Sequence, residues 1–292
     1  MKRFKLKHRD AVSAYVMLIP FMVFFLLFVI YPMIKSVLDS FTNYNLYQRD
    51  FIGFRNYVRL AQDKIFLRSI LNTLVFAVFS IVPLMVLGLT AAILVNRQSK
   101  VMYACRAALI YPYVTSMVAV SMVWLYMFDP TNGMLNKILG LFGAPRQWFL
   151  HDETQALWCL IVVNIWKNIG YVMMIYLAAL QSVPTSLYEA ATMDGAGGFR
   201  MTFSITLPTI KPITFFLLTT LSVECFKTFE QVRIMTNGGP VSSTTTITHQ
   251  IYMAAFSEFK MGYASAMSVV LLAIVFVMTV INLKLGRQLE DL

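Results

Sequence analysis

Tyr188-Glu189-Ala190-Ala191-Thr192-Met193-Asp194-Gly195-Ala196 is a short polar segment set between two long apolar runs. Pro184 lies just ahead of it, and Ser186 with Glu189 three residues later fits a capping box, so a helix is predicted to begin here. Gly195 and the Gly197-Gly198 pair then break the helix and let the chain turn back. The segment therefore predicts a polar surface helix between two membrane-length runs.

The rest of the chain is apolar over most of its 292 residues. Hydrophobic residues make up 58% and charged residues 13%, and the mean hydropathy of +0.67 lies outside the profile of a soluble domain. A helix needs about 20 mostly apolar residues to cross a hydrocarbon core, where a lone strand would leave its amides unsatisfied. Six windows approach that length: 14–34, 70–95, 107–127, 156–180, 209–234 and 264–285. The sequence therefore predicts an all-α, polytopic membrane bundle of six transmembrane helices.

The predicted organisation is one membrane domain with two short tails. Residues 1–13 are a basic N-terminal tail, 14–285 the membrane domain with the polar helix at 184–198, and 286–292 a C-terminal tail. The first apolar run is too long for a signal peptide and ends without a small-x-small cleavage site. Six spans put both termini on one side, and the basic tail favours the cytoplasm. The basic loop at 39–69 opposes that bias, so charge alone does not fix the orientation.

The polar helix suits contact with another protein. Leu187, Ala191 and Asp194 share one face, and the helix dipole favours Glu189 near the N-terminus. The two alanines leave a low surface that a partner can approach closely. An ordinary interfacial helix is the alternative interpretation. A nucleotide-binding loop at Gly195–Gly198 is not supported, because no strand precedes it and no Lys-Ser/Thr follows.

The segment Glu189–Pro208 reads as E-A-A, three residues, G, nine residues and I-x-L-P. This spacing resembles the signature of the membrane subunit of binding-protein-dependent ABC importers. The resemblance implies a cytoplasmic helix that docks onto an ATP-hydrolysing subunit, and both termini are then also cytoplasmic. The coupling residues that it implies are Glu189, Ala190, Ala191, Asp194 and Gly195.

Further stretches resemble the carbohydrate-importing branch of the same family, of the maltose, lactose and glycerol-phosphate permease type. Phe51–Tyr57 and Asn72-Thr73 resemble the first outer loop and second span of that family. Thr236-Asn237-Gly238-Gly239-Pro240 and Gly262-Tyr263-Ala264 resemble the end of the fifth span and the outer loop that follows it. The resemblance implies a maltose-permease-like member of a heterodimer that imports a carbohydrate, an oligosaccharide in the first instance. The location that it implies is a prokaryotic plasma (inner) membrane.

The partners that the resemblance implies are a second, homologous permease subunit, two nucleotide-binding ATPase subunits, an extracellular solute-binding protein and the lipid bilayer. ATP and Mg would be held by the ATPase subunits, and no cofactor by this chain. The chain contains no G-x-x-x-x-G-K-[ST] motif, which agrees with a transport subunit that is not itself an enzyme.

Two predicted spans carry a polar stripe on an otherwise apolar helix. The first stripe is Asn164, Lys167, Asn168 and Tyr171, and the second is Glu224, Lys227, Thr228 and Gln231. Both have the spacing i, i+3, i+4, i+7, which places each set on one helix face. Polar side chains within a membrane normally face a cavity or the bundle interior. These eight residues are the predicted substrate pathway, with Trp166, Tyr171, Phe226 and Phe229 available to stack on sugar rings.

The charges in these stripes have two open interpretations. Neutral-sugar pathways more often carry amides and aromatics than charges such as those of Lys167, Glu224, Lys227 and Glu230. The charges could pair with one another along the helix, extended by Arg233. Alternatively, Lys167 or Lys227 meets the solute, which would then be an acidic sugar such as a uronate-containing oligosaccharide.

Other classes of protein fit the sequence less well. His8, His151 and His249 lie in the tail or outer regions and form no H-E-x-x-H motif, so an intramembrane enzyme or metal site is not expected. A secondary transporter or channel working without ATP would use the polar stripes, but would leave the E-A-A helix without a role. The net charge of +10 is scattered among loops, which favours contact with lipid rather than nucleic acid. The three cysteines are predicted to be isolated, buried thiols.

Overall fold

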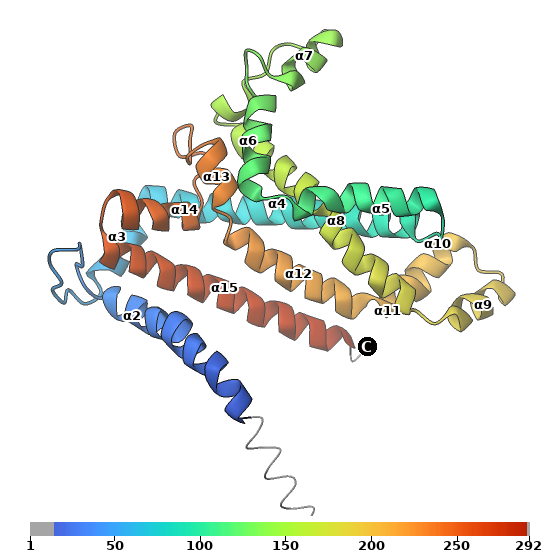
Figure 1. The fold of residues 1–292 in the computed structure, drawn as a ribbon, viewed down its shortest axis with the longest axis horizontal. Coiled ribbons are helices and arrows are strands. Elements are labelled where there is room, and N and C mark those ends of the chain that lie inside the picture. The colour runs from blue at the N-terminus through green and yellow to red at the C-terminus, as the bar shows by residue number, and fades with distance from the viewer. Residues whose placement is uncertain (1–14, 291–292) are drawn as a thin grey trace, which may run out of the picture. The chain divides into compact units, whose positions relative to one another are not determined.

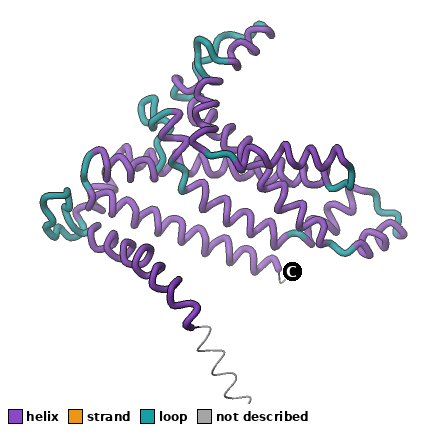
Figure 2. The backbone as a smooth tube through the Cα atoms, in the orientation of Figure 1, coloured by secondary structure: helices purple, strands orange, loops and turns teal. Residues whose placement is uncertain are grey.

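The structure, a computed structural model, describes residues 15–290, so the predicted basic tail 1–13 lies outside the described residues. Helices make up most of this part of the chain (Figures 1 and 2). Within it, the extended residues pair only at a single bridge between Thr42 and Phe51. The prediction of an all-α membrane bundle is confirmed.

The helices follow one another in the order in which Figure 1 labels them. Residues 15–25 are helical and continue into η1 (Leu26–Ile30) and α2 (Tyr31–Asp39). The others are α3 (Arg55–Gln62), α4 (Lys64–Val95), α5 (Lys100–Val114), α6 (Met117–Met127), α7 (Met134–Leu141), η2 (Phe149–His151), α8 (Ala156–Ser182), α9 (Thr185–Met193), α10 (Gly198–Met201), η3 (Thr202–Thr206), α11 (Leu207–Thr209), α12 (Lys211–Phe226), α13 (Glu230–Met235), α14 (Ile247–Tyr252), η4 (Met253–Ser257) and α15 (Met261–Glu290).

Four of the described helices are long and apolar enough to cross a membrane without interruption. They are Tyr15–Asp39, Lys64–Val95, Ala156–Ser182 and Met261–Gly286. Two further candidates are bent pairs: Lys100–Val114 with Met117–Met127, at 97°, and Gly198–Thr209 with Lys211–Met235, at 65°. The described residues therefore hold six spans if each bent pair crosses as one. The windows at 107–127 and 209–234 gave no sign of bends this sharp.

Prolines account for the position of both bends. Pro112 lies inside α5, three residues before Thr115 and Ser116 take up extended backbone. Pro208 and Pro212 flank the second bend at Ile210. A proline has no N–H to donate, and its ring crowds the preceding turn, so a helix kinks or ends beside it.

The chain forms two compact units, each considered separately. The larger second unit comprises Asp63–Gln250 and Leu271–Leu292. Its core is the contact between α4 and α8, where Phe76, Leu84, Val172 and Met173 are fully buried. Gly88 permits this close approach, because a Cβ at that position would clash with the side chain of Val172. The two continuous helices α4 and α8 therefore provide the support on which the interrupted spans pack.

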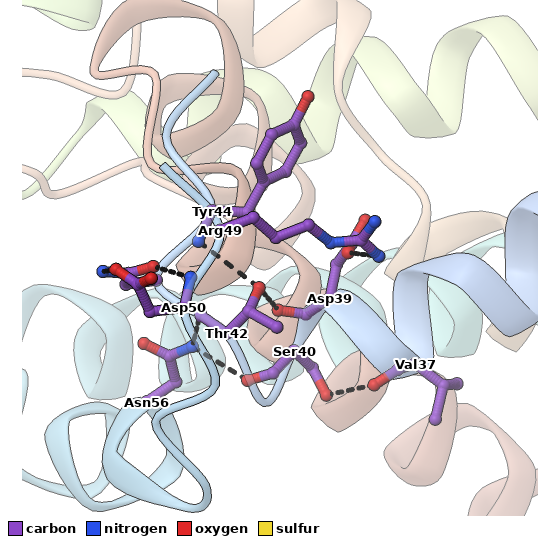
Figure 3. A network of polar contacts seen from close by, with 9 residues as sticks. Val37, Asp39, Ser40, Thr42, Tyr44, Arg49, Asp50 and Asn56 are labelled. Atoms are coloured by element: carbon purple, nitrogen blue, oxygen red, sulfur yellow. Dashed lines mark hydrogen bonds and ion pairs between the residues drawn. The ribbon is translucent and has the colours of Figure 1, made fainter. Parts of the chain in front are cut away.

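The first unit comprises the described part of Met1–Gln62 together with Ile251–Val270. A polar network orders the loop after α2 (Figure 3). The Asn56 amide donates to the carbonyls of Ser40 and Thr42, both at 2.8 Å. Arg49 pairs with the carboxylate of Asp39 at 2.5 Å. The stretch Phe51–Tyr57 thus has a structural role that its composition did not reveal.

The later stretch Gly262-Tyr263-Ala264 belongs to this same unit. The Gly262 amide donates to the Tyr44 carbonyl at 2.9 Å, and a Cβ on Gly262 would clash with the carbonyl oxygen of Thr42. Arg59 places its guanidinium 4.7 Å from the centre of the Tyr263 ring. Two stretches about 200 residues apart in sequence are therefore joined by backbone contact that only glycine allows.

Candidate functional site: an exposed helix and a polar cavity

The predicted coupling residues lie on α9 and the turn that follows it, at the tip of the second unit (Figure 1). Glu189, Ala190, Asp194 and Gly195 are exposed and Ala191 is partly so, and none of the nine residues of α9 is buried. Apolar side chains are exposed beside them, with Met193 at 89% and Phe199 at 84%. Such exposure is typical of a surface that contacts a protein partner or a membrane.

The predicted capping box at Ser186 is not formed. The helix begins at Thr185 after Pro184 as N-cap, and no side chain bonds to the first-turn amides. Ser186 is already the second helical residue, so its hydroxyl cannot reach the amides that an N-cap residue serves. The predicted end is confirmed: Gly195 has φ of +73°, a left-handed backbone that favours glycine.

One side-chain contact ties α9 to the segment that leads into the fifth span. The Tyr188 hydroxyl lies 2.9 Å from Oγ1 of Thr206. Thr206 is buried and ends η3, a π-helical turn. Tyr188 is only partly exposed, although its neighbours on α9 are exposed. This hydrogen bond therefore sets the orientation of the exposed helix against η3.

Removing this hydrogen bond should weaken the link between α9 and the fifth span. From the coupling role that the E-A-A resemblance implies, we expect Tyr188→Phe to leave ATP hydrolysis by the assembled complex in place, but to lower solute moved per ATP by about two- to tenfold, the range of one ordinary hydrogen bond. The ratio is measured in proteoliposomes. Thr206→Val should give the same result. Thr209→Val, which removes only a bond to the Ile205 carbonyl, should not.

A cavity of about 780 Å³ lies in the second unit between α5, α6, α8, α12 and α13. All eight residues of the two predicted polar stripes line it: Asn164, Lys167, Asn168, Tyr171, Glu224, Lys227, Thr228 and Gln231. The volume is within the range of small-ligand sites. Helical spacing brought the first set together because α8 is continuous. The second set reaches the same cavity although its helix is interrupted after Phe226.

Other residues complete the cavity, and the sequence did not single out most of them. Tyr113 stacks on Tyr171 with ring centres 4.8 Å apart and planes 17° from parallel, and Phe229 also lines the wall. Two of the aromatic residues proposed for sugar stacking lie elsewhere: Trp166 packs on Trp124, and Phe226 lines an apolar groove with residues of α15. Pro112 within an apolar window is the signal that could have placed Tyr113 beside a bend.

The charged residues of the cavity fit neither mutual pairing nor solute contact completely. Glu224 and Lys227 form an ion pair at 3.5 Å, with side chains 66% and 62% exposed, so solvent weakens it. Lys167 is buried, and its ammonium donates to the Tyr113 carbonyl at 2.9 Å and, more weakly, to that of Pro112 at 3.5 Å. Arg233 bonds to the side chain of Asn237, at the start of the next loop. Mutual pairing therefore accounts for Glu224 and Lys227, whereas Lys167 contacts backbone.

Gln231 is the most unusual residue of the cavity wall. Its side chain is 2% exposed, and neither its amide oxygen nor its amide nitrogen has a hydrogen-bond partner among the described residues. A buried amide without partners costs about 1–3 kcal/mol. The described residues thus leave this amide in need of a hydrogen-bond partner next to the cavity.

The chain after α13 folds back as a mostly buried polar segment, Ser243–His249, which is called the polar plug below. His249 is 3% exposed, with Nδ1 3.2 Å from Oγ1 of Thr245 and Nε2 3.4 Å from Oδ1 of Asn237. Asn72 on α4 donates to the carbonyls of Ser242 and Thr245 at 3.1 and 3.0 Å. Burial lowers the pKa of His249 to about 4, and the positive charge of Arg233 adds to this effect. His249 is therefore neutral at pH 7.

Acid should destabilise this plug. The pKa of His249 is about 4 in the folded chain and near 6.5 in an unfolded one, so the unfolded state takes up the proton first as pH falls. The stability contributed by neutral His249 is thus present above about pH 6.5 and declines toward pH 4. We expect His249→Gln to flatten the fall in melting temperature between pH 6.5 and 4. The exposed His151, changed to Gln, should leave that fall unaltered.

No group of three His, Cys, Asp or Glu side chains in residues 15–290 is placed to hold a metal ion. Of the three cysteines, Cys159 and Cys225 are buried and Cys105 is partly so, and all are free thiols. A bundle of apolar helices with an internal polar cavity and an exposed helix at one end defines a multi-pass membrane transport subunit.

The comparisons with known proteins give the family. Residues 85–290 match the family described as "Binding-protein-dependent transport system inner membrane component", and the chain belongs to it. It is 33% identical to the sn-glycerol-3-phosphate transport system permease protein UgpA of Pectobacterium atrosepticum over 94% of each chain. It is 30% identical to the trehalose/maltose transport system permease protein MalF of Thermococcus litoralis over 98% of each.

Solved structures also match almost the whole chain. One of them is a bacterial alginate ABC transporter in complex with a periplasmic protein that carries an alginate pentasaccharide. The TM-score is 0.86 and the identity 27%, over 98% of this chain and 97% of the other. The identification of the chain as a member of the ABC importer permeases, made from the E-A-A spacing, is confirmed.

Proposed function

We propose that this chain is a permease subunit of an ATP-driven importer for a carbohydrate, and that it forms part of the solute pathway. The observation that carries the proposal is the meeting of all eight stripe residues around one cavity, in the same unit that bears the exposed α9. The relatives named above handle glycerol phosphate, trehalose or maltose, and alginate, which supports a solute of the carbohydrate class.

In this proposal α9 docks onto an ATP-hydrolysing subunit, and the end of the second unit that carries α9 faces the cytoplasm. ATP and Mg are held by that partner and not by this chain. A second, homologous permease subunit completes the pathway, and an extracellular solute-binding protein delivers the solute. The location is the plasma membrane of a prokaryote. The family description, a binding-protein-dependent inner membrane component, supports these partners and this location.

The structure suggests how movement would pass from α9 to the cavity. Val183 and Pro184 alone separate α9 from α8, the helix that carries Asn164, Lys167, Asn168 and Tyr171. The Tyr188–Thr206 hydrogen bond links α9 to η3, which leads into α12 and its residue Glu224. A displacement of α9 therefore acts on both walls of the cavity together, as alternating access to one central site requires.

The charge of the cavity bears on the class of saccharide. Lys227 is the cation that a solute carboxylate would meet, because its ion pair with Glu224 is solvent-exposed and open to exchange. Together with the likeness to an alginate transporter, this supports an acidic oligosaccharide as the first candidate solute. A neutral saccharide, bound by Asn164, Asn168 and Gln231, is the second.

Uptake by the complete transporter, purified from its native membrane and reconstituted in proteoliposomes, tests both proposals. Maltose, sn-glycerol 3-phosphate and an alginate pentasaccharide are offered with and without ATP. Uptake that requires ATP supports the importer, whereas uptake of equal rate without ATP would favour a secondary transporter or channel. Competition by neutral sugars alone would eliminate the acidic solute.

A further inference from the structure

Interruptions in two membrane spans leave backbone carbonyls without helical partners. The helix α5 ends at Val114 and α6 begins at Met117. In the fifth span α12 ends at Phe226 and α13 begins at Glu230. The C-terminal end of each helix leaves four carbonyls without a partner in the helix, and in lipid they must find donors within the protein. Both interruptions border the cavity, which is lined by Tyr113, Met117, Lys227, Thr228 and Phe229.

A lysine on another helix donates to free backbone carbonyls at the first interruption. Nζ of Lys167, on α8, donates to the Tyr113 carbonyl at 2.9 Å and lies 3.5 Å from that of Pro112. The same ammonium lies 5.4 Å from the centre of the Tyr113 ring, a cation–π arrangement. Lys167 therefore fixes both the end of α5 and the aromatic ring that stacks on Tyr171.

Two threonines of the polar plug donate to free backbone carbonyls at the second interruption. Oγ1 of Thr248 donates to the Phe226 carbonyl, and Oγ1 of Thr246 donates to the Thr228 carbonyl, each at 3.0 Å. These carbonyls lie on either side of Lys227, which lines the cavity. No proline occurs between Phe226 and Glu230, so local sequence does not explain the interruption. The threonine contacts supply the compensating bonds.

The donors are themselves anchored to the two continuous helices. Lys167 is on α8, and the polar plug is bound to α4. Thr73 of α4 accepts from the Ile247 amide at 3.1 Å, and Asn72 of α4 donates to the carbonyls of Ser242 and Thr245. Thr246 and Ile247 are fully buried. Beyond the interruptions α6 packs against α13. The α6–α13 pair also packs directly on α8, as Trp124 does on Trp166, but its two chain connections through the interruptions are held from α8 and α4.

We propose that Lys167, Thr246 and Thr248 are positioning residues that fix the two interruptions and so set the shape of the cavity. Lys167 acts on the carbonyl of Tyr113, and the solute cation role falls to Lys227. The assignment of the cavity as a solute pathway rests on the proposed function, whereas the role of the three residues in holding the interruptions does not.

Distances across each interruption, measured with pairs of spin labels in the complete transporter without ATP or solute, test the proposal. Labels at Tyr103 on α5 and Tyr126 on α6, both more than half exposed, report the first. Cys105 is replaced by Ser, and the buried Cys159 and Cys225 are kept. Labels at Phe216 and Glu230, both exposed, report the second.

Lys167→Met is expected to raise the population of a second distance between labels at 103 and 126 about tenfold, because a bond from an ammonium to a carbonyl is lost. Lys167→Arg, which keeps a donor, should restore the single distance. Lys227→Met is the matched control, since it removes a cavity lysine whose ammonium pairs, within residues 15–290, with Glu224 alone. The double variant Thr246→Val/Thr248→Val should change the distance between labels at 216 and 230, and the two serine variants should restore it.

An unchanged distribution in Lys167→Met, or an equal change in Lys227→Met, would overturn the proposal. If Lys167→Met does not assemble, the polar variant Lys167→Gln, whose amide is one bond too short to reach the Tyr113 carbonyl, takes its place under the same criteria. Because the measurement uses neither ATP nor solute, its outcome is separate from that of the uptake assay. Failure of uptake with the distances as expected would count against the proposed function alone.

Discussion

Glu189→Arg is expected to strip the ATPase subunits from the transporter while leaving the permease folded. Glu189 is exposed on α9 and forms no hydrogen bond or ion pair with other described residues. Its replacement therefore removes no hydrogen bond or ion pair from the described fold. At a docked interface, reversal of its charge would lose one favourable pairing and add a repulsion. Truncating one member of a buried interfacial charge pair alone costs about 2–5 kcal/mol, which corresponds to a loss of affinity of about thirtyfold or more.

The measurement is affinity purification of the tagged chain from its native membrane, with bound subunits identified by mass. The wild type should bring down an ATPase and a second permease. The Glu189→Arg chain should retain the permease and lose the ATPase. Glu153→Arg, an equally exposed charge reversal in the loop before α8, is the matched control and should retain both. Recovery of the ATPase with Glu189→Arg at wild-type yield would mean that α9 is an ordinary interfacial helix.

The sequence was sufficient to predict the continuous parts of this fold. Apolar length locates α4, α8 and α15, because a helix that spans lipid satisfies its own backbone bonds and needs no distant partner. For the same reason the spacing on α8 placed Asn164, Lys167, Asn168 and Tyr171 on one cavity wall. The E-A-A spacing gave the family, which the comparisons confirm. Its function in coupling stays a prediction.

Pro112 is a local signal for the first interruption, but the second, after Phe226, has no such signal, and distant residues hold both. Lys167 contacts a carbonyl 54 residues away, and Asn72 contacts Thr245 173 residues away. A hydropathy window records neither contact. The loop after α13 was taken for an outer connection, yet its Thr244, Thr246 and Ile247 are fully buried by bonds to α4 and to the interrupted span. Polar composition predicts exposure only where no buried partner awaits the side chain.

Gln231→Leu is expected to stabilise the protein and impair transport at once. The buried amide of Gln231 lacks partners among the described residues, so a leucine of similar volume relieves a desolvation cost of about 1–3 kcal/mol. The melting temperature should therefore rise. If a solute hydroxyl bonds to this amide, its removal should lower the efficiency of uptake by about tenfold or more.

A second buried polar group without a partner in the described residues provides the control that distinguishes the effect on stability from the effect on transport. Ser121 on α6 is fully buried, and its hydroxyl is likewise unbonded among the described residues, but it is not part of the cavity wall. Ser121→Ala should raise the melting temperature and leave uptake unchanged. Uptake kinetics and thermal melting of both variants, in the reconstituted and detergent-purified transporter, give the comparison. Loss of stability in Gln231→Leu with normal uptake would show that the amide supports the fold and does not bind the solute. A residue retained for binding is expected to lower the stability of the protein while it is present, and its loss is expected to impair transport.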